Sequence, residues 1–289
     1  MSLPRIPGVN SDSAATELLR TPERLAGNTQ SMGHRIGAAL DTDAAVDDWG
    51  LAPTPERPYP VVLVHGTLGD RESVWRKAAS ALRAAGHRIF RLNYGELPAL
   101  PGLYGLGDIR KSTKELAEFV DRVLADTKAS KVDLVGHSQG GMIPHYYLKY
   151  LGGAGKVRRV VGIAPSNHGV EVAGLTALVR QVPGVQAVVE DKVLFRLSPA
   201  FTQLLHDSEF VGELVAPGDT VDGVGYTVLW STRDELVQPP ESQQLRPARP
   251  DHPVTNTCLQ IIAPQNRTTH LAMPYDPIVV RETLKALAD

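Results

Sequence analysis

A serine stands at the tip of a glycine-rich turn in the stretch VDLVGHSQGGM, residues 132–142. The run VDLV before the turn is typical of a buried strand, and MIPHYYLKYL after it is typical of a helix. Gly-x-Ser-x-Gly occurs by chance in many proteins, but between a strand and a helix it predicts a strained turn that presents the serine. Gly136 and Gly140 are then required where a Cβ would clash. Ser138 is therefore a candidate nucleophile, and the alternative is a tight connector with an incidental serine.

A serine hydroxyl is a poor nucleophile at neutral pH unless a base lies beside it. The chain has nine histidines. Functional loops of a parallel sheet follow the carboxyl ends of its strands, so the base should follow a strand. His270 meets this condition, because it comes after an expected strand over 258–262 and before the last expected helix. His252 and His87 precede strands and belong to the opposite edge. His270 is therefore the predicted base.

A carboxylate is needed to orient the imidazole and to stabilise its charged form. The expected strand YTVLWS, residues 226–231, is followed by TRDELVQP, which offers Asp234 and Glu235. Asp234 is closer to the end of the strand, and the apolar pair after Glu235 can pack down and fix the loop. We therefore predict Asp234 as the acid, with Glu235 as the alternative.

Ester chemistry also requires donors for the oxyanion. The stretch HGTLG, residues 65–69, directly follows the buried run 61–64 and belongs to the same edge of the sheet as Ser138. The backbone N–H groups of Thr67 and of Gln139, the residue after the nucleophile, are the predicted pair of donors. We expect His65 to brace this loop.

The elements that must position these residues alternate between strands and helices. This alternation predicts the α/β class, with a mostly parallel central sheet and helices on both faces. Ser112 and Glu115 form a capping-box pattern that predicts the start of a helix. The expected strands are 61–64, 88–95, 132–135, 157–164, 226–231 and 258–262, and the other expected helices are 71–86, 142–151 and 276–287.

Two regions fall outside this alternation. Residues 1–48 are polar and rich in Pro and Gly, and we interpret them as an N-terminal extension with one helix near Ala14–Arg20. Residues 49–289 then form the catalytic domain. Within it, residues 171–220 contain two apolar helical patches and no clear strand, which indicates a small cap or lid inserted above the sheet.

A Gly/Pro-rich loop over 97–108 follows a strand on the catalytic edge. Its apolar side chains are candidates for contact with an acyl chain, and the equally weighted alternative is that they pack the loop onto the core. These candidate pocket residues are Leu100, Leu103, Tyr104 and Leu106.

Composition excludes several classes of protein. The 289 residues carry a net charge of −2 with no basic run, so we expect no nucleic-acid partner. No stretch approaches the roughly 20 apolar residues that span a bilayer. Neither a metal-ligand spacing nor a dinucleotide fingerprint is present, so no metal and no cofactor are expected. The sequence does not fix the oligomeric state.

The N-terminus shows neither a basic region nor an apolar core of the kind found in signal peptides. Cys258 is the one cysteine, so no disulfide can form within the chain, which mildly favours a reducing compartment. We therefore expect a cytoplasmic location, and the alternative is a secreted protein whose signal peptide is absent from this sequence.

Several blocks of the chain resemble an α/β-hydrolase family, the bacterial triacylglycerol lipase/esterase group sometimes called class 2 lipases. The resemblance extends from about Trp49 to Leu287, although family members often carry cysteine pairs and are exported. It implies a triad of Ser138, Asp234 and His270, with Thr67 and Gln139 at the oxyanion hole. The blocks are VVLVHGTLGD, KVDLVGHSQGGMIPHYYLKYLGG, VGIAPSNHG, GDTVDGVGYTVLWSTRDELVQP and THLAMPYDP.

We therefore expect a serine carboxylic-ester hydrolase that cleaves acyl esters, small or lipid-like, through an acyl-enzyme, with transient contact to a lipid interface. An acyltransferase is an alternative, because the same triad passes the acyl group to an alcohol when an alcohol replaces water. A non-catalytic hydrolase-like binding protein is a further alternative, but such a protein is expected to have lost a triad or oxyanion element, and none is missing here.

Overall fold

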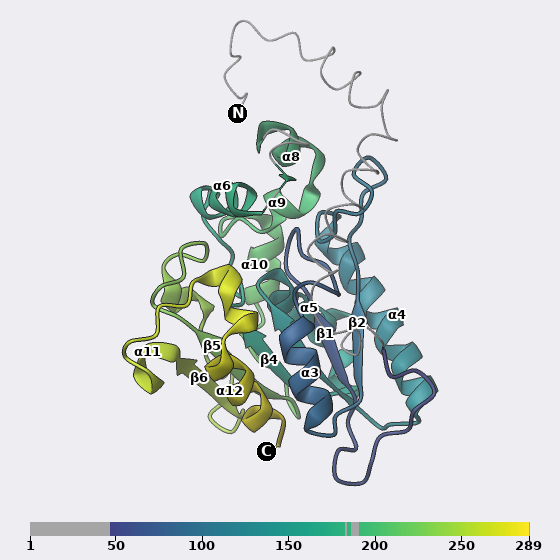
Figure 1. Ribbon diagram of the computed structural model, residues 1–289. Coiled ribbons are helices and arrows are strands. Elements are labelled where there is room, and N and C mark those ends of the chain that lie inside the picture. Colours follow the sequence, from purple (N-terminus) through teal and green to yellow (C-terminus); the bar gives the residue numbers. More distant parts are fainter. Residues whose placement is uncertain (1–46, 183, 186–190, 289) are drawn as a thin grey trace, which may run out of the picture.

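A computed structural model describes residues 47–182, 184–185 and 191–288. Its centre is one sheet of six parallel strands in the order β2-β1-β3-β4-β5-β6 (Figure 1). This arrangement is the α/β class expected from the alternation of elements. The helix expected near Ala14–Arg20 lies outside the described residues. The strands are β1 Val61–Val64, β2 Ile89–Leu92, β3 Val132–His137, β4 Val157–Ile163, β5 Gly225–Trp230 and β6 Val254–Cys258.

Five strands lie where the sequence predicts them, but the prediction of a strand over 258–262 was wrong. The strand ends at Cys258, and Leu259–Ile262 form the short helix α11. β6 is an edge strand that pairs with β5 alone, and its side chains are mostly polar and partly exposed. A long apolar run predicts a strand that is buried on both faces of a sheet. A search for such runs therefore does not detect a polar edge strand such as β6. His270 still follows the last strand.

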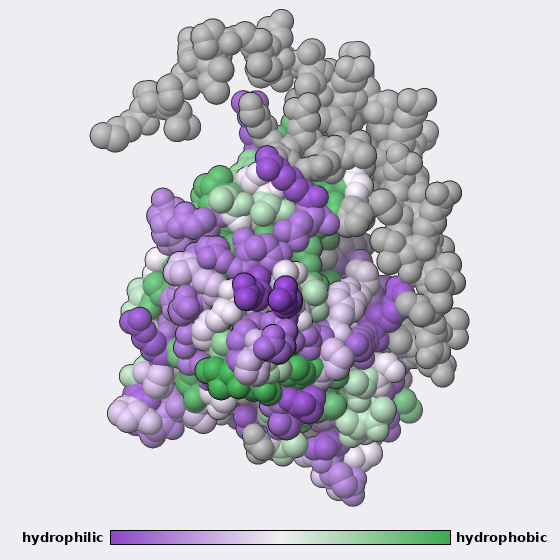
Figure 2. Space-filling model, turned by 60° about the vertical axis from the view of Figure 1, so that its left-hand side comes forward, coloured by the Kyte–Doolittle hydropathy of each residue, from purple (hydrophilic) through white to green (hydrophobic). Residues whose placement is uncertain are grey.

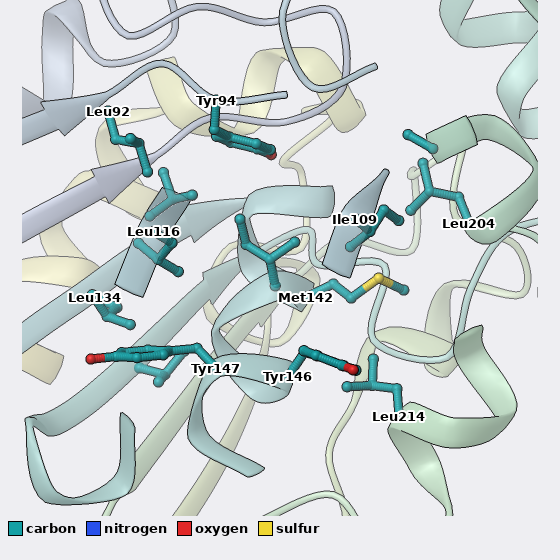
Figure 3. Close-up of a cluster of buried hydrophobic side chains, with 14 of the residues drawn as sticks. Leu92, Tyr94, Ile109, Leu116, Leu134, Met142, Tyr146, Tyr147, Leu204 and Leu214 are labelled. Carbon is teal, nitrogen blue, oxygen red and sulfur yellow. The ribbon is translucent and has the colours of Figure 1, made fainter. Parts of the chain in front are cut away.

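Helices cover both faces of the sheet (Figure 1). Val61 and Leu63 of β1 face a core shared with α3 and α12, whereas Val62 and Val64 face the core under α4 and α5. Figure 3 shows the second core, where side chains from β3, α4, α5 and the following helices meet. This alternation along β1 is why a continuous apolar run is needed there. The covering helices are α3 Arg76–Ala84, α4 Ile109–Thr127, α5 Gln139–Tyr150 and α12 Pro277–Ala288.

The helix α4 begins earlier than the capping-box pattern predicts. Asp108 is its N-cap and accepts a hydrogen bond from the backbone N–H of Lys111 over 3.0 Å. Ser112 is instead buried within the helix, and Glu115 accepts from the backbone N–H of Gly95. The capping-box prediction was wrong because an aspartate one turn earlier provides the cap.

Between β4 and β5 the described residues form helices and no strand, as the sequence predicts. In Figure 1, α6, α8 and α9 lie above the end of the sheet at which β1 and β3 finish. These helices are α6 Val172–Gln181, α8 Asp191–Leu197, α9 Pro199–Gln203 and α10 Glu209–Val215.

The described end of the predicted N-terminal extension is attached to the sheet. Asp48 donates its backbone N–H to the carbonyl of Ile89, and the Asp47 carboxylate pairs with the buried guanidinium of Arg91 at 3.1 Å. Trp49 packs edge-on against Phe90 at 4.7 Å between ring centroids. These contacts extend the packed domain two residues before Trp49.

The molecular surface on the α6 and α11 side is mainly hydrophilic, with small apolar patches (Figure 2). Large apolar side chains that are exposed include Ile261 at 82% and Val172 at 53%. Within the described ranges, no helix combines the length and apolar character needed to cross a membrane.

Candidate active site

The strand order reverses between β1 and β3. The chain passes from β1 to β2 on one side and then returns to β3 on the other, so the loops after β1 and β3 leave in opposite directions. Open parallel sheets bind ligands in the crevice at such a switch point. HGTLG after β1 and the Ser138 turn after β3 both lie there.

Ser138 forms a strained turn between β3 and α5. Its φ is 56° and its ψ is −125°, a conformation that costs energy for a residue with a Cβ. A Cβ on Gly136 would lie 1.9 Å from the carbonyl oxygen of Gly140, and a Cβ on Gly140 would lie 2.1 Å from that of Val64. The structure thus gives both glycines the role that the sequence predicts. Ser138 is partly accessible and lines a pocket.

The structure brings His270 and Asp234 together. Nδ1 of His270 lies 2.7 Å from Oδ2 of Asp234, and the two side chains are 1% and 0% exposed. Oδ1 of Asp234 accepts the backbone N–H groups of Leu236 and Val237. Burial opposes the charge on Asp234, but the His270 ring and these hydrogen bonds outweigh it and hold the pKa of Asp234 below its ordinary value. His270 lines the same pocket as Ser138.

The main chain of His270 is held on both sides. Its N–H donates to the Glu235 carboxylate over 3.2 Å, and its carbonyl accepts from Nε2 of His137 over 3.1 Å. Burial and the neighbouring His270 ring lower the pKa of His137 to about 3, so His137 is neutral near pH 7. Glu235, the alternative acid in the sequence, therefore contacts the His270 backbone, while Asp234 contacts its ring.

The two predicted oxyanion donors lie on either side of the switch point. Within the described part of the chain, the N–H groups of Thr67 and Gln139 donate to no other residue. The Gln139 side chain accepts from the hydroxyls of Thr67 and Tyr94, at 3.3 and 3.1 Å, which ties the two loops together. His65 stacks on Tyr94 and bonds the Gly66 carbonyl, which is the bracing role expected for it.

The pocket next to Ser138 is mostly apolar. None of the four residues predicted from the 97–108 loop lines it within the described ranges. Leu100 and Leu106 are buried in the core, and Leu103 packs against that core, so the alternative expectation is the one observed. The carbonyl of Tyr104 accepts the N–H of Leu68. The lining residues are Thr67, Ser138, Ser166, Val170, Gly174, Leu175, Leu178, Leu204, Leu236, Val237 and His270.

Two polar residues near the site have no signal in the sequence. Ser166 lines the pocket, and its backbone N–H donates to the carbonyl of Ser138. Gln243 is fully buried and donates to Asp234. Each is a single polar residue in a loop, which no periodicity or motif distinguishes. Within the described ranges, no cluster of His, Cys, Asp and Glu has the arrangement of a metal site.

The family of the chain follows from comparison with known proteins. The model of the alpha/beta hydrolase fold family matches residues 59–216, more than half of the chain. The chain belongs to the alpha/beta hydrolase fold family. Ser138 lies inside the residues that the family model matches, and Asp234 and His270 follow them.

Curated relatives of this alpha/beta hydrolase include bacterial lipases. Triacylglycerol lipases of Pseudarthrobacter phenanthrenivorans and Burkholderia plantarii are each 36% identical to it over 93 residues. That stretch is 30% of this chain, and it spans only 27% and 24% of the two lipases. The match thus covers about a quarter of each relative.

Solved structures extend the likeness over most of the chain. Lipase B of Aspergillus fumigatus superimposes with a TM-score of 0.63 at 25% identity, over 80% of this chain and 52% of that one. The match with the mature Bacillus licheniformis lipase BlEst2 spans 84% of this chain and 96% of that lipase, with a TM-score of 0.59 at 17% identity. The second likeness concerns the fold alone.

Proposed function

We propose that this alpha/beta hydrolase is a serine carboxylic-ester hydrolase that cleaves acyl esters through an acyl-enzyme. The observation that carries the proposal is the contact of His270 Nδ1 with the buried Asp234 carboxylate, beside a strained Ser138 that lines the same pocket. The similarity to triacylglycerol lipases supports the same class of reaction.

The proposed mechanism follows from the hydrogen bonds of the two ring nitrogens of His270. Nδ1 of His270 donates to Asp234, which leaves Nε2 with a lone pair to take the proton of the Ser138 hydroxyl. The Ser138 oxygen attacks the ester carbonyl, and the N–H groups of Thr67 and Gln139 stabilise the oxyanion. His270 then protonates the departing alcohol. Water, activated by the same histidine, releases the acid and restores Ser138.

The pocket supports a substrate with an apolar acyl chain. Its walls include Val170, Leu175 and Leu178 from the segment after β4, which supports a cap over the site that includes the helix α6. The enclosed space between these walls is about 10 Å³, roughly the room that one water molecule needs. We therefore propose short to medium acyl chains as the preferred substrates.

A series of p-nitrophenyl esters from C2 to C16 tests this function. The expected result is hydrolysis with one acid released per p-nitrophenol and the highest kcat/KM for short or medium chains. A parallel assay with emulsified triglyceride separates lipase from esterase activity. Absence of hydrolysis of every ester by folded protein would contradict the proposal.

A further inference from the structure

Gln243 places a buried amide on the Asp234 carboxylate. Its Nε2 donates to Oδ2 of Asp234 over 3.1 Å, and the same oxygen contacts Nδ1 of His270. We propose that Gln243 is a positioning residue that fixes the Asp234 carboxylate, and through it the His270 ring, for attack by Ser138. This inference rests on the proposed function.

The hydrogen bonds of Asp234 show why this donor matters. Leu236 and Val237 hold Oδ1 through their backbone N–H groups at 2.9 and 2.8 Å. Among the described residues, Gln243 is the one donor to Oδ2 other than His270. Without Gln243, Oδ2 would be held only by the ring that it must orient, so the plane of the carboxylate would be fixed at one oxygen.

Gln243 is itself anchored to the loop after β4. Its carbonyl accepts from Nδ2 of Asn167 over 2.6 Å, and the carbonyl of Ser242 contacts Nδ1 of His168 over 2.5 Å. The other ring nitrogen of His168 lies 3.1 Å from Asp219. The short 3-10 helix η3, Pro240–Gln243, is thereby tied to the segment that begins beside Ser138.

A neutral amide suits this position chemically. It donates to Oδ2 without a positive charge, and an added cation would oppose the imidazolium that forms on His270. Loss of the donor removes a hydrogen bond that favours the charged carboxylate, so the Asp234 carboxylate binds a proton more tightly. The other titratable groups at His270, Glu235 and His137, contact its backbone and not Oδ2.

The test compares Q243L and Q243E in the full chain, with kcat and KM for p-nitrophenyl butyrate measured from pH 5 to 9. In Q243L we expect kcat to fall roughly 10- to 100-fold, because a hydrogen bond to a charged group is lost, while KM stays within about twofold. The acid limb of kcat/KM should move to higher pH. Gln243 does not line the pocket, so substrate binding should persist.

Q243E keeps the shape of glutamine, but its new carboxyl donates only when protonated. We expect the kcat of this variant, relative to that of the wild type at the same pH, to be highest at low pH and to fall as pH rises, which a merely structural role would not produce. The matched control is Q244E, the same charge change at a half-buried neighbour that forms no hydrogen bond to Asp234 within the described residues. Its pH profile should match that of the wild type.

Circular dichroism checks that each variant is folded, and Q243E alone carries the test if Q243L does not fold. The proposal is overturned if folded Q243L and Q243E keep the wild-type kcat and pH profile while the wild type is active. It is also overturned if Q243E and Q244E lose activity alike at every pH. An inactive wild type would instead contradict the proposed function, so the two failures are distinguishable.

Discussion

Among the described residues, a hydroxyl, a histidine and an aspartate come together at the proposed site and also at a second place. At the carboxyl ends of the strands these are Ser138, His270 and Asp234. At the opposite ends, Nδ1 of His252 lies 2.6 Å from Oγ1 of Thr220, and its Nε2 lies 2.5 Å from Oδ1 of Asp222.

The surroundings of the two groups are reversed. The Asp234 side chain is 0% exposed, whereas that of Asp222 is 74% exposed. Thr220 is buried and also accepts the N–H of Ala248, while Ser138 lines a pocket on a strained turn. The two groups thus share three residue types but differ in what the proposed chemistry needs. An accessible hydroxyl, a buried carboxylate and free backbone donors occur together only at the first of the two.

Replacement of the two hydroxyls tests this difference most strongly. S138A should lower kcat of ester hydrolysis by about 10⁵–10⁶-fold, since the nucleophile is lost. T220V should leave kcat within about twofold of the wild type, because Thr220 only braces the segments before β5 and β6. Steady-state kinetics with p-nitrophenyl butyrate measures both. Equal losses in the two variants would break the comparison.

The two aspartates should also differ. D234N should lower kcat by about 10⁴-fold, because an amide favours the wrong tautomer of His270 and does not stabilise the imidazolium. D222N removes a solvent-exposed pair, for which we expect less than about 1 kcal/mol of lost stability and no effect on kcat. The same assay with thermal unfolding separates these effects, and a large activity loss in D222N would contradict them.

The apolar pocket is the next difference between the two groups. L178A enlarges the pocket and should shift the ratio of kcat/KM for C8 over C4 esters upward by about 3- to 10-fold. The control is L214A, a buried leucine of the same segment that does not line the pocket. L214A should lower the free energy of unfolding without changing the ratio, and a shift in both variants would contradict the assignment of the lining.

Protonation of the buried histidines changes the stability of the fold and not the chemistry at Ser138. Burial lowers the pKa of His65 to about 4 and that of His137 to about 3, so both are neutral in the folded protein at pH 6. The unfolded chain binds these protons below about pH 6.5, so acidification favours unfolding. Each histidine should remove about 1.4 kcal/mol of stability per pH unit between pH 6.5 and its folded pKa.

Urea unfolding from pH 7.5 to pH 5 measures this slope. H65Q should reduce it by about 1.4 kcal/mol per pH unit, because glutamine does not titrate there. An unchanged slope in folded H65Q would show that His65 is not buried in its neutral form.

The local features of the site could be predicted from the sequence. The apolar run, the two glycines and the helix around Ser138 all depend on neighbouring residues. The rule that functional loops follow the carboxyl ends of parallel strands selected His270 and Asp234. This rule needs only the order of strands along the chain, which was predicted correctly although the bounds of β6 were not. What failed depended on partners far along the chain. Leu100 and Leu106 of the 97–108 loop are buried in the core, and Gln243 is defined only by its contact with Asp234.

Labelling with a fluorophosphonate, followed by mass spectrometry of the peptides, tests the central claim most directly. The account predicts one adduct, on Ser138, that appears with the loss of esterase activity and is absent in S138A. An adduct on another residue such as Thr220, or active protein that stays unlabelled, would contradict it.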